Sequence, residues 1–195
     1  MDPRHRTRPD HDRRHPVHVV LRVTREVSSL RTPKAYRAIR RAVDRCRARS
    51  DFRIAHISIQ SNHVHLLVEA DDKRALARGM QGFTICAARR LNRELRRARG
   101  TVFAYRYHAT TIESPTQARN AVSYIVNNWR RHRRDLYDAR RTDPYASAHA
   151  VRGWRVARRP DELPVVRATT WLLTVGLDRV RAIRDDEVPG PDPVP

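Results

Sequence analysis

The stretch from Ile54 to Glu69 constrains the fold more than any other part of the chain. Two runs of β-branched and aliphatic residues flank the polar corner Gln60-Ser61-Asn62. This pattern predicts a hairpin of two central antiparallel strands. Because side chains alternate between the faces of a strand, His63 and His65 point to one side, and the apolar positions after each of them point into a core.

His63 and His65 leave two interpretations open. Two imidazoles side by side on a rigid strand form half of a divalent-metal site. The alternative is that they are polar residues on a solvated face of the sheet, because short motifs also match by chance. Other residues of the chain have to decide between the two.

The other elements predict an α+β fold. Pro33 suits the first turn of a helix, and a further helix begins after Asp72. The order of elements suits a ferredoxin-like or RRM-like antiparallel sheet of four to five strands with helices packed on one face. The other face either carries the histidines openly or is partly covered by the last helix. The expected elements are strand 17–24, helix 33–49, strands 54–59 and 63–69, helix 73–99, strand 102–112 and helix 115–132.

Three residues inside these elements bear on packing. His18 lies in the first strand, and we interpret it as a structural histidine. Gly79 and Gly82 lie inside a helix, where each glycine costs about 1 kcal/mol against alanine. Another element is therefore expected to approach the helix closely at these positions.

Composition divides the chain of 195 residues into four parts. Residues 1–15 mix arginine, histidine, aspartate and proline and predict a disordered basic arm. Residues 16–135 contain the regular pattern and predict one domain. We expect a C-terminal extension with short helices over 136–184 and a disordered, acidic, proline-rich tail over 185–195.

The chain is strongly basic, with 41 lysines and arginines against 21 acidic residues and a net charge of +20. Such an excess predicts a polyanionic partner, most simply nucleic acid, although a basic protein from an arginine-rich proteome would share it. The aromatic residues of strand 102–112 would share one face and either stack on bases or fill the core. The residues that we expect to contact DNA are Arg89, Arg90, Arg93, Arg96, Arg97, Arg106 and Tyr107.

The two cysteines, Cys46 and Cys86, fall in predicted helices and indicate core residues in a reducing compartment. No apolar run reaches the length of a membrane span, and no apolar signal core follows the charged N-terminus. We therefore expect a cytoplasmic protein that does not enter a membrane.

Tyr124 and Asn128 occupy the edge of the apolar stripe of helix 115–132. They lie one above the other, about 110° from the centre of the stripe on a helical wheel. This position predicts side chains that are neither buried nor fully exposed. A residue at such an edge can reach the face of a sheet on which the helix packs.

These motifs together resemble the single-tyrosine HUH transposases, most closely the branch of REP-associated tyrosine transposases. The segment 61–68 resembles the HUH motif (histidine, hydrophobic residue, histidine), and 124–128 resembles the helix that carries the nucleophilic tyrosine. The resemblance extends over residues 16–155. Further similar segments are Met80–Phe83, Arg90–Arg93, Gly100–Phe103, Arg106–His108, Asp143–Ala148 and Gly153-Trp154.

The resemblance implies the HUH endonuclease fold for residues 16–135 and a transposase that acts on single-stranded, hairpin-bearing DNA. His63, His65 and Asn128 would bind Mg²⁺ or Mn²⁺, and Tyr124 would form a 5′-phosphotyrosine intermediate. A bound divalent ion offsets the phosphate charge that repels nucleophiles. Trp129 stands where many members have proline, so the helix is expected to continue past Asn128.

Two other classes of protein compete with this interpretation. A non-catalytic binder of single-stranded nucleic acid with an RRM-like sheet would explain the charge and the aromatic residues, but would leave the pairing of histidines and tyrosine as coincidence. A structural zinc site lacks suitably spaced further histidines or cysteines. The sequence leaves a monomer and a homodimer equally open.

Overall fold

The structure, a computed structural model, describes residues 10–190 except 99, 139 and 158. Within these residues it contains one antiparallel sheet of four strands in the order β2-β3-β1-β4. The element order β1-α1-β2-β3-α2-β4 is that of a ferredoxin-like fold, so the predicted fold class is confirmed. The strands are β1 (Val17–Arg22), β2 (Phe52–Ile59), β3 (His63–Ala70) and β4 (His108–Thr111).

One face of the sheet packs against α1 (Pro33–Cys46) and α2 (Lys73–Glu94). Alternate residues of the central strands, such as Val19 in β1 and Leu66 in β3, are fully buried there. Gly79 allows α2 to approach Phe52 of β2, whereas no atom lies near the missing side chain of Gly82. The close approach predicted from the two glycines is therefore confirmed at Gly79 alone.

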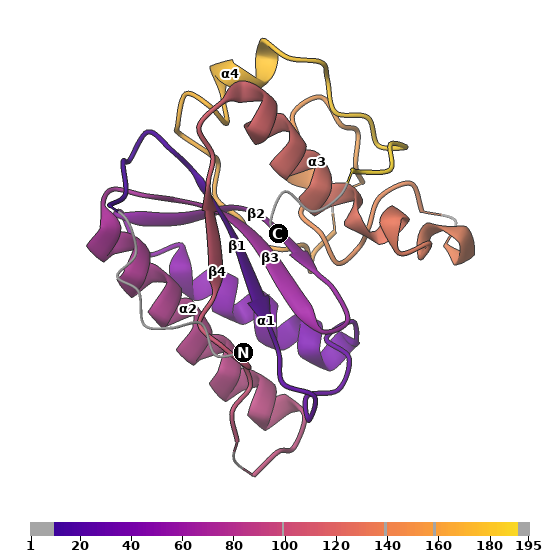
Figure 1. Cartoon of the computed structure of the whole chain (residues 1–195). Coiled ribbons are helices and arrows are strands. Elements are labelled where there is room, and N and C mark those ends of the chain that lie inside the picture. Colours follow the sequence, from indigo (N-terminus) through magenta and orange to yellow (C-terminus); the bar gives the residue numbers. More distant parts are fainter. Residues whose placement is uncertain (1–9, 99, 139, 158, 191–195) are drawn as a thin grey trace.

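The other face of the sheet is covered by α3 (Pro115–Arg131), as Figure 1 shows. Helix α3 contacts β2 and β3 and forms a second apolar cluster with their outward residues. The helices thus lie on both faces, so the last helix does cover the face that carries the histidines. We refer to the side of α1 and α2 as the apolar face and to the side of α3 as the histidine face.

Two predicted elements are shorter in the structure. Helix α2 ends at Glu94 because Arg96 adopts a positive φ of 54° that breaks the helix. The strand expected over 102–112 is regular only at 108–111, and an isolated bridge pairs Phe103 with Val23. The aromatic residues of this segment therefore do not share the single strand face that their spacing predicted.

The C-terminal extension contains only short helices: η1 (Asp135–Tyr137), η2 (Ala148–Ala150) and α4 (Val175–Asp178). We expected a disordered tail from residue 185, but residues 185–190 lie along α3, where Asp185 O accepts from Arg130 Nε at 2.9 Å. The part of the predicted arm at 1–9 and of the tail at 191–195 lies outside the described residues. No helix in the described part of the chain has both the length and the apolar character needed to cross a bilayer.

Candidate active site

The candidate site begins at the tight corner between β2 and β3. Asn62 O accepts a hydrogen bond from Val23 N–H at 2.9 Å, which ties the corner to the end of β1. This bond fixes the start of β3, where His63 is half-buried and His65 is fully buried. The two rings are 4.6 Å apart and nearly perpendicular, at 86°. The predicted placement of both histidines on one face is therefore present.

The surroundings of His65 keep its imidazole neutral. Burial, followed by the nearby His18, His63 and His132, holds the pKa of His65 well below its usual value of 6.5. Its Nδ1 atom forms a hydrogen bond of 3.1 Å with Nε2 of His18. Its Nε2 atom is buried and has no hydrogen-bond partner among the described residues. A neutral imidazole with one uncommitted nitrogen is the form that binds a metal ion.

Helix α3 carries Tyr124 to this histidine. Ser114 Oγ accepts from Gln117 N–H at 3.3 Å, and Pro115 occupies the first turn, so the helix starts at a defined residue. The rings of Tyr124 and His65 are 5.2 Å apart in an edge-to-face arrangement at 79°. The expectation that a residue at this position reaches the sheet is therefore met.

The predicted half-exposed position of Tyr124 is wrong, because only 6% of the residue is exposed. Its ring lies against the buried rings of His65 and His18 on the sheet, while the C-terminal segment packs along a different side of α3. Asn127 Nδ2 donates to Arg184 O at 2.9 Å, and Ser123 Oγ bonds to the carboxylate of Glu187. Helix α3 is thus enclosed between the sheet and this segment.

Asn128 follows Tyr124 by one helical turn and lies on the same side of α3. The next turn on that side carries His132, whose charge contributes to the lowered pKa of His65. Asn128 lies between these two neighbours of His65 and is fully buried. Neither its Oδ1 nor its Nδ2 has a hydrogen-bond partner among the described residues. Trp129 leaves the helix uninterrupted, as predicted.

The residues present fit a divalent metal. A buried imidazole nitrogen and a buried amide oxygen without partners are each costly unless a further group binds them. Two imidazoles and one amide oxygen form a neutral donor set suited to a small divalent cation. Within the described residues, no three histidine, cysteine or acidic side chains form a metal-binding group, so the third protein ligand would be the amide of Asn128.

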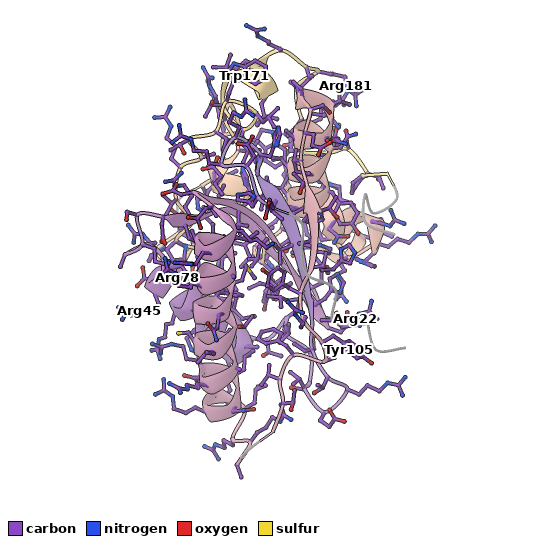
Figure 2. The ribbon with its side chains drawn as sticks, turned by 60° about the vertical axis from the view of Figure 1, so that its left-hand side comes forward. Arg22, Arg45, Arg78, Tyr105, Trp171 and Arg181 are labelled. Carbon is purple, nitrogen blue, oxygen red and sulfur yellow. The ribbon has the colours of Figure 1, made fainter. Side chains whose placement is uncertain are left out.

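The arginines predicted to contact DNA do not gather at this site. Arg89, Arg90 and Arg93 lie on α2, on the apolar face, where they line a groove of about 680 Å³ with Arg45 and Arg49 of the α1 end. No acidic side chain is among the described residues that line this groove. Figure 2 shows Arg45 projecting on that side of the molecule, opposite Arg22. We call this surface the arginine groove.

The remaining predicted DNA contacts follow α2. Arg96 is exposed, Arg97 is half-buried, and Arg106 is exposed in the loop before β4. Tyr107 packs against the core of the apolar face, whereas Tyr105 is 59% exposed. The core alternative thus fits Tyr107, and Tyr105 is the tyrosine of this loop that is open to a stacking base. An RRM-like binder would instead display aromatic rings on an uncovered sheet.

Two residues of the site escaped the sequence interpretation. His18 is fully buried beside His65 and Tyr124, and Arg22 is exposed directly opposite His63 in the β1–β3 register. Strand alternation contained the signal, because the core positions of β1 are odd-numbered and its even-numbered side chains must share the histidine face. The sequence pattern did not show that β1 pairs with β3, and this pairing is what brings His18 and Arg22 next to the two histidines.

Comparison with known proteins shows the family of the chain and agrees with its fold. The family model described as "Transposase IS200 like" matches residues 13–128, a span that contains both histidines and Tyr124 and ends at Asn128. Among the solved structures that match is a REP-associated tyrosine transposase bound to a REP hairpin. That structure is 15% identical, with a TM-score of 0.58, and the match covers 85% of this chain and 99% of the other. No curated protein matches the chain.

Proposed function

Since the chain belongs to the IS200-like transposase family, we propose that it cuts and rejoins single-stranded DNA through a 5′-phosphotyrosine bond on Tyr124. The observation that carries the proposal is the contact between Tyr124 and His65. Tyr124 contacts a neutral imidazole with an uncommitted nitrogen, and one helical turn later α3 carries the buried amide of Asn128, which has no hydrogen-bond partner among the described residues. No packing role requires this combination of groups.

The chemistry divides between a bound ion and the side chains. Mg²⁺ or Mn²⁺, when held by His63, His65 and Asn128, offsets the phosphate charge and polarises the scissile bond. Tyr124 attacks phosphorus through its hydroxyl oxygen, loses its proton and displaces a 3′-hydroxyl, which takes up a proton. The phosphotyrosine bond keeps the energy of the original linkage, so the strand can be rejoined without a further energy source.

DNA would reach the site at the His63 end of β3. His63 is half-buried there, and Arg22 opposite it is exposed, so a phosphate at this point meets a positive charge. Figure 2 places Tyr105 at the same end as Arg22, and Ala104 N–H donates to Arg22 O at 2.9 Å. A base next to the cut could therefore stack on Tyr105.

We further propose that hairpin-bearing DNA is the substrate and that the arginine groove binds its phosphates away from the site. The similar REP-associated transposase was solved with a hairpin, which supports a folded substrate. The absence of acidic side chains among the described residues of the groove supports phosphate binding by Arg89, Arg90 and Arg93.

The test is adduct formation with a labelled single-stranded DNA hairpin in the presence of Mn²⁺. Wild-type protein should form a covalent adduct that peptide mapping places on Tyr124. Tyr124→Phe removes one oxygen, keeps the buried ring and should bind DNA normally without forming an adduct. Tyr105→Phe is the matched control, because it makes the same change in an exposed ring and should still form the adduct. An adduct on any other tyrosine would overturn the assignment.

A further inference from the structure

His18 is the buried histidine of the site that the proposed chemistry leaves without a role. It lies on β1 opposite Leu67, one diagonal step from His65 in the β1–β3 register. Diagonal neighbours on adjacent strands lie within reach of aromatic side chains. The rings of His18 and His65 are 5.2 Å apart and nearly parallel, at 26°, and the ring of Tyr124 is 6.1 Å from His18.

The hydrogen bond between the two histidines has two possible directions. Nε2 of His18 and Nδ1 of His65 are 3.1 Å apart, and exactly one of these nitrogens carries the shared proton when both rings are neutral. If His18 donates, His65 carries its own proton on Nε2, where it has no acceptor among the described residues. If His65 donates, its Nε2 atom instead presents a lone pair, and His18 carries its own proton on the buried Nδ1 atom.

The second direction is the one that makes His65 a ligand. A histidine that binds a metal donates its other ring N–H to a fixed acceptor, which sets both the tautomer and the ring orientation. Burial excludes water from this bond, because both rings are 0% exposed. His18 Nε2 is the acceptor that the structure provides for His65.

We infer that His18 is a positioning residue: it accepts the Nδ1 proton of His65 and thereby holds the Nε2 lone pair of His65 ready for a divalent cation. The inference rests on the proposed function, because it takes His65 to be a metal ligand. It adds a residue from β1 to a site that otherwise consists of β3 and α3. His18 itself does not bind the metal in this arrangement.

Two variants separate positioning from packing. His18→Gln can place an amide oxygen near the position of Nε2 and so keeps an acceptor. His18→Met fills a similar volume with a side chain whose sulfur is at best a weak acceptor. If His18 only filled space, both variants would behave alike. If it positions His65, His18→Met should lose the Nδ1 tautomer of His65 and the affinity for Mn²⁺, and His18→Gln should keep both.

The first measurement is the tautomer of His65 in metal-free protein, read from ¹⁵N-edited NMR spectra of the histidine rings. The wild type and His18→Gln should carry the proton of His65 on Nδ1, and His18→Met should lose this preference. A proton on Nε2 of His65 in the wild type would overturn the inference without touching the assignment of Tyr124.

The second measurement is the affinity for Mn²⁺ alone, by calorimetry, without DNA. Loss of such a supporting hydrogen bond typically weakens metal binding by about 10- to 100-fold, which we expect for His18→Met and not for His18→Gln. Wild-type affinity in His18→Met would refute positioning while leaving the metal site intact. If neither the wild type nor His65→Ala binds Mn²⁺, both the metal site and the role of His18 are refuted.

Discussion

The two faces of the sheet bury different kinds of side chain. On the apolar face the buried residues that the strands contribute are all aliphatic or aromatic, and the charges lie outside on α1 and α2. On the histidine face the strands bury five polar or charged side chains, three of which are histidines. These five residues are His18, His56, Ser58, His65 and Glu69.

This difference between the faces suggests that the apolar face stabilises the fold and that the histidine face carries the chemistry. Burying a polar group costs free energy unless a partner satisfies it, so an apolar layer is the more stabilising solution. The histidine face accepts this cost and leaves His65 Nε2 and the amide of Asn128 unsatisfied within the described residues. The apolar face must therefore supply most of the folding energy, and changes to the two faces should have different consequences.

The largest effect is expected from removing the ligands on the histidine face. His63→Ala and His65→Ala should each reduce metal-dependent cleavage by about 10- to 100-fold or more, because a lost ligand should cost at least as much as a lost supporting partner. DNA affinity should stay close to that of the wild type, because the arginine groove is unchanged. Single-turnover cleavage at low Mn²⁺ and a parallel binding titration measure the two quantities.

Asn128→Ala tests a weaker ligand and is compared with the two histidine variants. A water molecule can replace a neutral amide ligand, so cleavage should fall less than in either histidine variant. Cleavage at the wild-type level in the His63→Ala/His65→Ala double variant would remove the functional distinction between the two faces.

On the apolar face, two glycines of α2 offer a matched pair. A methyl group at Gly79 would overlap the ring of Phe52, which is fully buried and cannot move aside, whereas Gly82 has open space. Gly79→Ala should destabilise the fold by about 1–3 kcal/mol through overpacking. Gly82→Ala should stabilise it by up to about 1 kcal/mol through helix propensity. Urea unfolding measures both, and equal effects would show that α2 does not pack tightly on the sheet.

The two faces also differ in how much of their structure the sequence predicts. Alternation in 54–69 and helical spacing in 33–46 identified the elements of the apolar face, because burial there follows hydrophobic pattern alone. The capping residues around Ser114 likewise fixed the start of α3. These signals are local, so they survive without knowledge of the tertiary contacts.

The histidine face depended on contacts that no local pattern records. The helical pattern places Tyr124 at a half-exposed edge, because no local pattern records that the rings of His65 and His18 lie against it. Spacing alone indicates a structural role for His18, because strand pairing, and not spacing, brings it to His65. The sequence shows that the arginines of α2 make a basic surface, but only the fold shows that Arg89, Arg90 and Arg93 lie on the apolar face, away from the histidines.

A smaller effect is expected when the buried His56 is changed. Burial lowers its pKa to about 4 from the usual 6.5, and its Nδ1 atom lies 3.3 Å from Ser147 Oγ. Between these two pH values the unfolded chain binds the proton more strongly, so the contribution to stability is complete above pH 6.5 and declines as the pH falls toward 4.

His56→Gln should therefore reduce the loss of stability between pH 7 and pH 5 by about 2 kcal/mol. The measurement is urea unfolding at both pH values in EDTA, so that metal release does not contribute. His108→Gln changes an exposed histidine of β4 and should leave the difference unaltered. An equal change in both variants would mean that burial on the histidine face does not set this pH dependence.

The smallest effect is expected when two positive charges are removed from the arginine groove by the double variant Arg89→Ala/Arg93→Ala. Each arginine that neutralises a phosphate adds about 0.7 to the steepness of the log–log salt dependence on single strands and about 0.9 on duplex DNA. The double variant should therefore bind hairpin DNA with a shallower salt dependence, yet form the adduct normally once DNA is saturating. Arg155→Ala with Arg167→Ala removes two exposed arginines of the C-terminal extension and is the control for net charge.

An unchanged slope of the salt dependence would exclude the groove from DNA binding. Slower adduct formation at saturation would instead show that the apolar face takes part in the chemistry, and the division between the faces would fail.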